Sequence, residues 1–79
     1  MMLAEEARKI TNDARENGVK NVLRKIMIKI EMSANNGYES IEFINLRYMD
    51  EVEKELKNHG YNVNISTSFD GDTIFEISW

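Results

Sequence analysis

An apolar pattern at helical spacing runs through residues 3–34 and constrains the fold of this chain more than any other feature. It is made by Leu3, Ala7, Ile10, Ala14, Gly18, Val22, Ile26, Ile30 and Ala34. Recurrence every three or four residues predicts one long helix with a single apolar stripe. Such a helix is about 48 Å long at 1.5 Å per residue, longer than a three-stranded sheet can cover. We therefore expect its first turns either to fold back or to pack on another copy of the chain, and favour the second.

Asn17 and Gly18 interrupt this helical pattern, and three outcomes are open there. Gly inside a helix costs about 1 kcal/mol relative to Ala. The interruption could be a kink, a break into two helices, or a close helix–helix contact in which only Gly fits. Asn35-Asn36-Gly37 then supplies a signal for the end of the helix.

A strand and a second helix are expected next. Residues 38–44 alternate between apolar and polar side chains, which predicts a strand with Ile41 and Phe43 on one face. Asn45 is a favoured N-cap residue, so we expect a helix from there to about Asn58. Its buried stripe would consist of Leu46, Met49, Val52 and Leu56.

The end of this second helix is strongly specified. Gly60 suits the left-handed position that follows a helix. Tyr61 would then pack back on Leu56, which is the hydrophobic contact of a Schellman motif. The sequence therefore predicts that the helix ends just before Gly60.

Residues 61–79 predict a β-hairpin that turns at Asp70-Gly71. A two-residue turn would place Ile65 beside Glu76 and expose half of the apolar side chains. A three-residue loop, with Gly71 as its left-handed third residue, avoids this mismatch. The resulting register pairs Ile65 with Phe75, Val63 with Ile77, and Tyr61 with Trp79. It directs Trp79 toward the core; the alternative is an exposed stacking platform.

Together these elements predict an α+β fold with the order α-β-α-β-β. We expect a single domain over residues 1–79, with a helical arm (1–34) and a β-α-β-β unit (38–79). The last strand should lie in the centre of a mixed three-stranded sheet, with the first and second strands parallel. The long N-terminal helix and the second helix would both pack on one face of this sheet. That face would be lined by Ile41, Phe43, Val63, Ile65, Phe75 and Ile77.

Composition and charge exclude several kinds of site. The chain has no Cys and one His, which excludes Cys-based and His-rich metal centres. A net charge of −4 disfavours direct nucleic-acid binding. The first residues do not form a signal peptide, and no run approaches the roughly 18 apolar residues of a membrane span, so we expect no membrane contact. Residues 1–34 carry seven Lys/Arg against five Asp/Glu, whereas residues 35–79 carry three against nine.

No group of side chains predicts catalysis. His59 follows the second helix, where it can interact with the last carbonyls and the helix dipole, and no nucleophile-elbow sequence accompanies it. Asp70-Gly71-Asp72 lacks the further ligands of a calcium loop. We therefore expect neither an enzyme nor a metal site, and no cofactor.

Two groups of residues are candidates for ligand binding. Asn45, Arg47 and Tyr48 lie at the expected start of the second helix, where free N–H groups attract anions. The alternative there is an ordinary cap with surface side chains. A basic stretch without acids could accept a nucleotide or an acidic partner, or could be a solvated helix face. It contains Lys20, Arg24, Lys25 and Lys29, and we take Arg24 and Lys25 with the first group as the candidate site.

Three segments of the chain resemble small accessory proteins of tailed bacteriophages and prophages. They are Glu-Ala-Arg-Lys-Ile-Thr (6–11), Glu-Leu-Lys-Asn-His-Gly-Tyr-Asn-Val (55–63) and Thr-Ile-Phe-Glu-Ile-Ser-Trp (73–79). The resemblance implies a protein of the bacterial host cytoplasm, where many such proteins counter host defences. It carries over no functional residue.

Two functions follow from this resemblance and the candidate residues. The first is a homo-oligomer, joined through the N-terminal helix, that sequesters a nucleotide-derived defence signal in pockets between subunits. The alternative is an inhibitor of a host defence enzyme, in which the acidic residues 35–79 cover a basic surface of that enzyme. A structural or regulatory phage protein is the third possibility.

Overall fold

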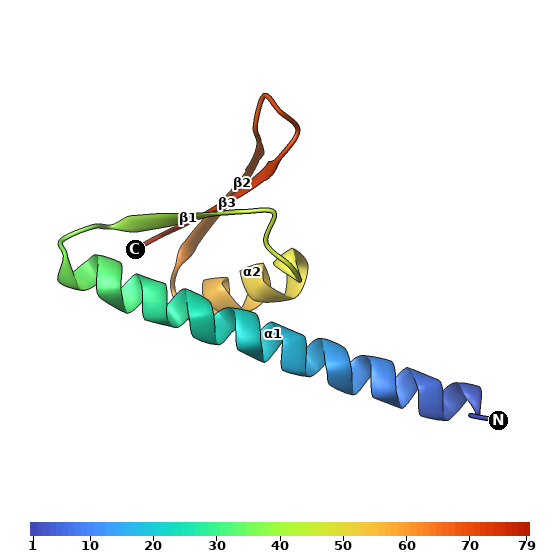
Figure 1. Cartoon of the computed structure of the whole chain (residues 1–79). Helices are drawn as coiled ribbons and strands as arrows, with labels where there is room; N and C mark the ends of the chain where they lie inside the picture. Colours follow the sequence, from blue (N-terminus) through green and yellow to red (C-terminus); the bar gives the residue numbers. More distant parts are fainter.

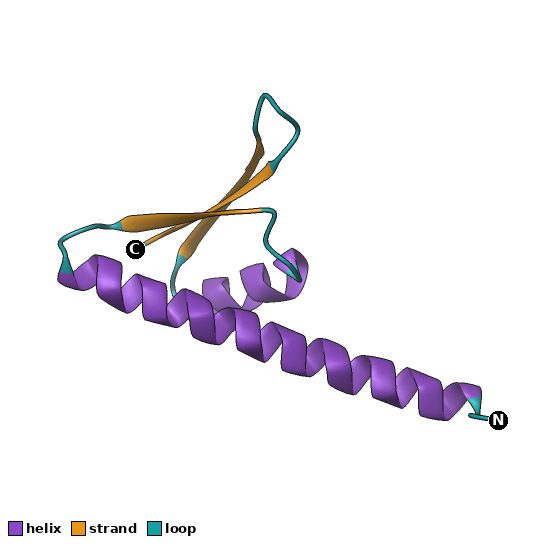
Figure 2. Cartoon of the chain, viewed as in Figure 1, coloured by secondary structure: helices purple, strands orange, loops and turns teal.

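The computed structural model describes residues 1–79 and has the predicted element order. The elements are α1 (Ala4–Asn35), β1 (Ser40–Ile44), α2 (Met49–Asn58), β2 (Asn62–Thr67) and β3 (Thr73–Ser78). The sheet lies over the C-terminal half of α1, and the N-terminal half projects beyond it (Figure 1). Both helices lie on the same side of the sheet (Figure 2). The predicted α+β fold is therefore confirmed.

The sheet has the strand order β1-β3-β2, so β3 is central as predicted. The outer strands run parallel to each other, but β3 separates them and every hydrogen-bonded pair is antiparallel. A mixed sheet was expected, but both of its hydrogen-bonded strand pairs are antiparallel. Val63 pairs with Ile77 and Ile65 with Phe75, as side-chain parity predicted.

The hairpin turn has the predicted three-residue loop. The Gly71 N–H donates to the Ser68 carbonyl (3.0 Å), and the Ser68 N–H donates to the Asp72 carbonyl (2.7 Å). Gly71 has a φ of +88°, a left-handed conformation that glycine adopts without steric cost. The alternation of apolar and polar residues in the two strands therefore predicts the length of the loop correctly.

Both helices end in Schellman motifs. At the end of α2 the Tyr61 N–H donates to the Leu56 carbonyl and the Gly60 N–H to the Lys57 carbonyl, each at 3.1 Å. The same pattern closes α1, where the Tyr38 N–H donates to the Ser33 carbonyl (2.9 Å). These bonds satisfy carbonyls that have no partner inside the helix.

The core lies between the sheet and the two helices. Its seven buried residues are Ile26, Ile30, Ile41, Val52, Leu56, Phe75 and Ile77. Ile65 was expected on the covered face but is 41% exposed, because it lies on the edge strand β2, whereas its partner Phe75 on the central strand β3 is fully buried. Trp79 was expected in the core but is 37% exposed. It lies at the chain end, edge-on to Tyr61 with ring centroids 6.4 Å apart.

α1 is one continuous helix, but its predicted stripe is not one face. Residues four apart are offset by about 40° around a helix, since each residue turns it by about 100°. Over many such steps the row winds around α1. Leu3 and Ile10 consequently point away from the side where Ile26 and Ile30 are buried, and residues 1–17 are all exposed. Neither helix combines the length and the apolar character needed to cross a membrane.

Asn45 is not the N-cap of α2, contrary to the sequence prediction. The helix begins at Met49, and its cap residue Tyr48 makes no side-chain capping bond. Asn45 instead adopts a φ of +52° and joins the end of β1 to the start of β3. Its amide nitrogen donates to Asp72 Oδ1 (3.1 Å), and its amide oxygen accepts from the Thr73 N–H (3.0 Å).

Substitution of Asn45 tests this bridging role. Asn45→Gly keeps the left-handed backbone but loses both amide bonds, so we expect about 1 kcal/mol less stability toward urea. Asn45→Ala should lose about 1–2 kcal/mol more, because a Cβ is strained in this conformation. A neutral Asn45→Gly variant would show that the bridge is dispensable. Equal values for Gly and Ala would contradict the strained backbone.

Candidate functional site

Three of the five predicted site residues line one small cavity. Lys25, Asn45 and Arg47 meet where α1 passes the connection between β1 and α2, around a hollow of about 240 Å³. Lys25 comes from α1, Asn45 follows the last residue of β1, and Arg47 precedes α2. The other lining residues are Val22, Ile26, Phe43, Ile44 and Leu46.

This hollow, which we call the basic cavity, has two cations and no carboxylate in its lining. Its floor is apolar, since Ile26 is buried and Phe43 and Leu46 are half-buried. A third cation stands close by, because Lys29 Nζ lies 4.7 Å from the Phe43 ring centroid. An anion with a flat apolar part matches this combination of charge and floor.

Asn45 shapes the basic cavity but has little capacity left to bind a ligand. Its amide nitrogen and oxygen already bond to Asp72 and Thr73. Only its remaining N–H and lone pair are unused. We therefore assign the ligand-facing role to Lys25 and Arg47.

Tyr48 does not line the basic cavity, although the sequence grouped it there. Its side chain packs on Gly18 of α1, so that a Cβ at Gly18 would lie 2.6–2.8 Å from the Cε2, Oη and Cζ atoms of Tyr48. Arg47 lies over one part of the ring with Cζ 5.6 Å from the centroid, and Arg15 lies 5.9 Å away. The close contact predicted at Gly18 is thus with an aromatic ring rather than with another helix.

Arg24 is not brought to the basic cavity. It is exposed on α1 and lines none of the hollows in the structure. Lys25 is one residue further along, which turns its side chain about 100° around the helix. This rotation separates two residues that the sequence placed in one basic stretch.

The N-terminus of α2 is occupied by the protein's own carboxylates. Asp50 and Glu51 lie in its first turn. Glu51 accepts a hydrogen bond from Arg15, and this bond lowers the pKa of Glu51 and raises the pKa of the Arg15 guanidinium. Two carboxylates at this end disfavour a further anion there, which makes the basic cavity the better candidate for an anion site.

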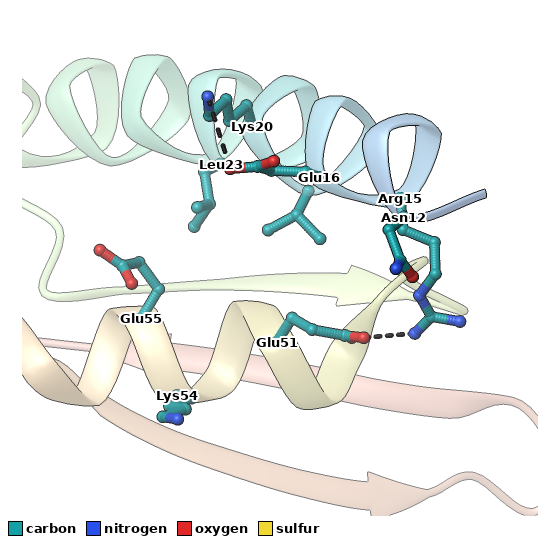
Figure 3. Close-up of a pocket in the computed structure, with 9 residues that line it drawn as sticks. Asn12, Arg15, Glu16, Lys20, Leu23, Glu51, Lys54 and Glu55 are labelled. Carbon is teal, nitrogen blue, oxygen red and sulfur yellow. Dashed lines mark hydrogen bonds and ion pairs between the residues drawn. The ribbon is translucent and has the colours of Figure 1, made fainter. Parts of the chain in front are cut away.

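The largest hollow lies elsewhere, between α1 and α2, and contains none of the five predicted residues. It measures about 570 Å³, and Figure 3 shows Glu51 and Glu55 of α2 directed toward α1. Its lining carries three cations and three carboxylates, so it has no net preference for charge. A hollow of about 290 Å³ shares Leu23 and Glu55 with it, which makes one groove along both helices.

The sequence prediction missed this groove because it followed a single stripe. Val19 and Leu23 line it and are half-buried, but both lie outside the row of nine apolar positions. Their spacing of four residues is the signal that could have revealed a second row. No three His, Asp or Glu side chains come together as a metal-binding group.

A double-mutant cycle tests the packing of Tyr48 on Gly18. In a Tyr48→Ala background, Gly18→Ala should stabilise the protein by about 1 kcal/mol through helix propensity. In the natural chain the same change must displace the ring, so it should give less stability or a loss. Urea unfolding of the four proteins measures the coupling, which we expect at about 1 kcal/mol or more. Thr11→Ala in the exposed N-terminal half of α1 is the control, and additive values for Gly18 and Tyr48 would refute the contact.

Comparison with known proteins gives one match. The family model described as Phage T4 Y10B protein matches residues 1–79. Searches of the curated proteins and of the solved structures found no match. The family match covers every element described above and confirms the resemblance to bacteriophage proteins. The chain therefore belongs to the Phage T4 Y10B protein family.

Proposed function

We propose that this phage protein is a binding protein rather than an enzyme, and that it sequesters a nucleotide-derived signalling molecule of the host cytoplasm. The observation that carries the proposal is the basic cavity, in which Lys25 and Arg47 stand over an apolar floor without an acid. Phosphate groups suit the two cations. A base or sugar suits the floor formed by Ile26, Phe43 and Leu46.

The size of the cavity bears on the ligand. Sites for small molecules commonly measure about 300–1,000 Å³, whereas the basic cavity measures about 240 Å³. A nucleotide would therefore place one part inside and extend beyond it. This supports an oligomer in which a neighbouring copy covers the remainder of the ligand.

A ligand panel tests the proposal. Cyclic dinucleotides, cyclic trinucleotides and cyclic ADP-ribose isomers would be screened by thermal shift and calorimetry. A ligand present at 100 times its Kd adds about 2.7 kcal/mol, which raises the Tm of a chain this short by about 10–20 °C. The expected result is such a shift for one class of ligand.

Matched variants locate the binding. Lys25→Ala and Arg47→Ala should each reduce the affinity at least tenfold, because each removes a charge-assisted contact with phosphate. Lys9→Ala removes an exposed cation from the arm of α1 and should leave the affinity unchanged. Sequestration is contradicted if no compound in the panel shifts the Tm. Equal effects of all three substitutions would contradict the assignment to this cavity.

A second candidate, inhibition of a host defence enzyme, is favoured by the uncovered face of the sheet. No helix packs on that face (Figure 2). Glu42 of β1 and Glu76 of β3 are directly paired there, and neither makes an ion pair with Lys or Arg. Like charges directly opposite in a sheet are destabilising. A basic surface on a partner would relieve this repulsion.

Neutralising one of these acids separates stability from binding. Glu42→Gln or Glu76→Gln should raise the free energy of unfolding by about 0.2–1 kcal/mol, since the repulsion is removed. The same change should weaken capture of a purified basic host nuclease and relieve its inhibition. Glu39→Gln lies outside the ladder and is the control. Unchanged inhibition in both variants would refute this candidate. If the tests of sequestration and of inhibition both fail, a structural or regulatory role is favoured.

A further inference from the structure

α1 has a second apolar face that nothing in the fold covers. Leu3, Ile10, Ile28 and Met32 are each 54–65% exposed. At about 100° per residue they share one side of the helix, opposite Ile26 and Ile30. We call this the back face of α1. Between Leu3 and Met32 the same side also carries Ala7, Ala14, Asn17, Asn21 and Lys25, all of which are exposed.

The two ends of the back face match when one copy is reversed against another. Reversal about the middle of α1 sets Ile10 opposite the partner's Ile28 and brings Leu3 within about one helical turn of the partner's Met32. The polar centre, Asn17 and Asn21, then meets its own counterpart. A two-fold interface requires this self-complementarity. If residue i of one copy contacts residue j of the other, then residue j of the first copy contacts residue i of the second. Polar Asn residues in such a contact fix the register of the two helices.

Charge distinguishes this antiparallel pairing from a parallel one. Residues 4–17 carry four acids and three bases, a net charge of −1, whereas residues 18–35 carry one acid and four bases, a net charge of +3. Antiparallel helices place each basic half beside the acidic half of the partner. Parallel helices would place two +3 halves side by side, which is repulsive.

We propose that the protein forms a two-fold dimer in which the back faces of two α1 helices pack antiparallel. The sheets and α2 helices then lie on the outer sides of the helix pair, because the core of each copy is on the opposite side of α1. The exposed arm of residues 1–17 thereby finds its partner in a second copy of the chain. The pairing does not require a ligand, although Lys25 lines the basic cavity and also lies at the edge of the back face.

Sedimentation of the full chain tests the dimer. The expected mass is about twice the 9.2 kDa of one chain. Ile10→Glu and Ile28→Glu change exposed residues of the back face and should each return the protein to the monomer mass with α-helical circular dichroism retained. Phe69→Glu changes an exposed residue at the hairpin tip and should remain dimeric. A monomeric natural chain at 100 μM, or dimers that survive both substitutions, would overturn the proposal.

Cross-linking tests the orientation, and the absence of natural Cys makes it specific. Leu3→Cys and Met32→Cys proteins would be mixed and oxidised with oxidised glutathione. An antiparallel pair should give the mixed Leu3–Met32 disulfide at least tenfold faster than a mixture of Leu3→Cys and Phe69→Cys proteins. A faster disulfide between two Leu3→Cys chains would show parallel helices and refute the arrangement. A mixed rate equal to that of the Phe69 control would refute it as well.

Discussion

Ile26 is completely buried where α1, α2 and the sheet meet, and the other elements take their places around that contact. Val52 and Leu56 reach it from α2, and Phe75 and Ile77 reach it from β3. Full burial of such a side chain contributes about 1.5–3 kcal/mol, so a small group of residues determines how the elements pack. β3 occupies the centre of the sheet, and both of these residues are fully buried there. The β-α-β-β unit is too small to cover more of the helix, and the arm is left exposed.

The features that the sequence predicted correctly depend on neighbours in the chain or on side-chain parity. The Schellman motif at Gly60 needs only residues 56–61, and the loop at Gly71 follows from matching the faces of two adjacent strands. Asn45 was misassigned because its partners, Asp72 and Thr73, lie 27 and 28 residues away. No local pattern distinguishes an N-cap asparagine from one that bridges two strands. The start of α2 was placed too early for the same reason.

The sequence predicted those residues of the candidate site whose position follows from the rotation of about 100° per residue around a helix. Lys25 and Arg47 line one cavity because α1 crosses the β1–α2 connection. The predicted packing of both helices on one face of the sheet already implied this crossing. Arg24 was grouped with Lys25 by composition, although rotation around the helix separates them. Tyr48 was grouped with Arg47 by adjacency, but its left-handed backbone (φ +56°) turns the ring onto Gly18. Such backbone conformations in non-glycine residues are rare and leave no clear sequence signal.

α1 connects the two proposals because one of its cations, Lys25, serves both. Lys25 lines the basic cavity and also contributes to the +3 charge that faces the partner's acidic half. A bound anion would offset that charge and weaken the attraction between the paired helices. Linkage is reciprocal, so this charge effect taken alone would lower the affinity of the dimer for the anion by the same factor. A neighbouring copy that covers the ligand would act in the opposite direction. Apolar contacts at Ile10 and Ile28 carry no charge and would persist. The coupling is therefore small and falls as salt screens the exposed charges over about 8 Å at physiological ionic strength.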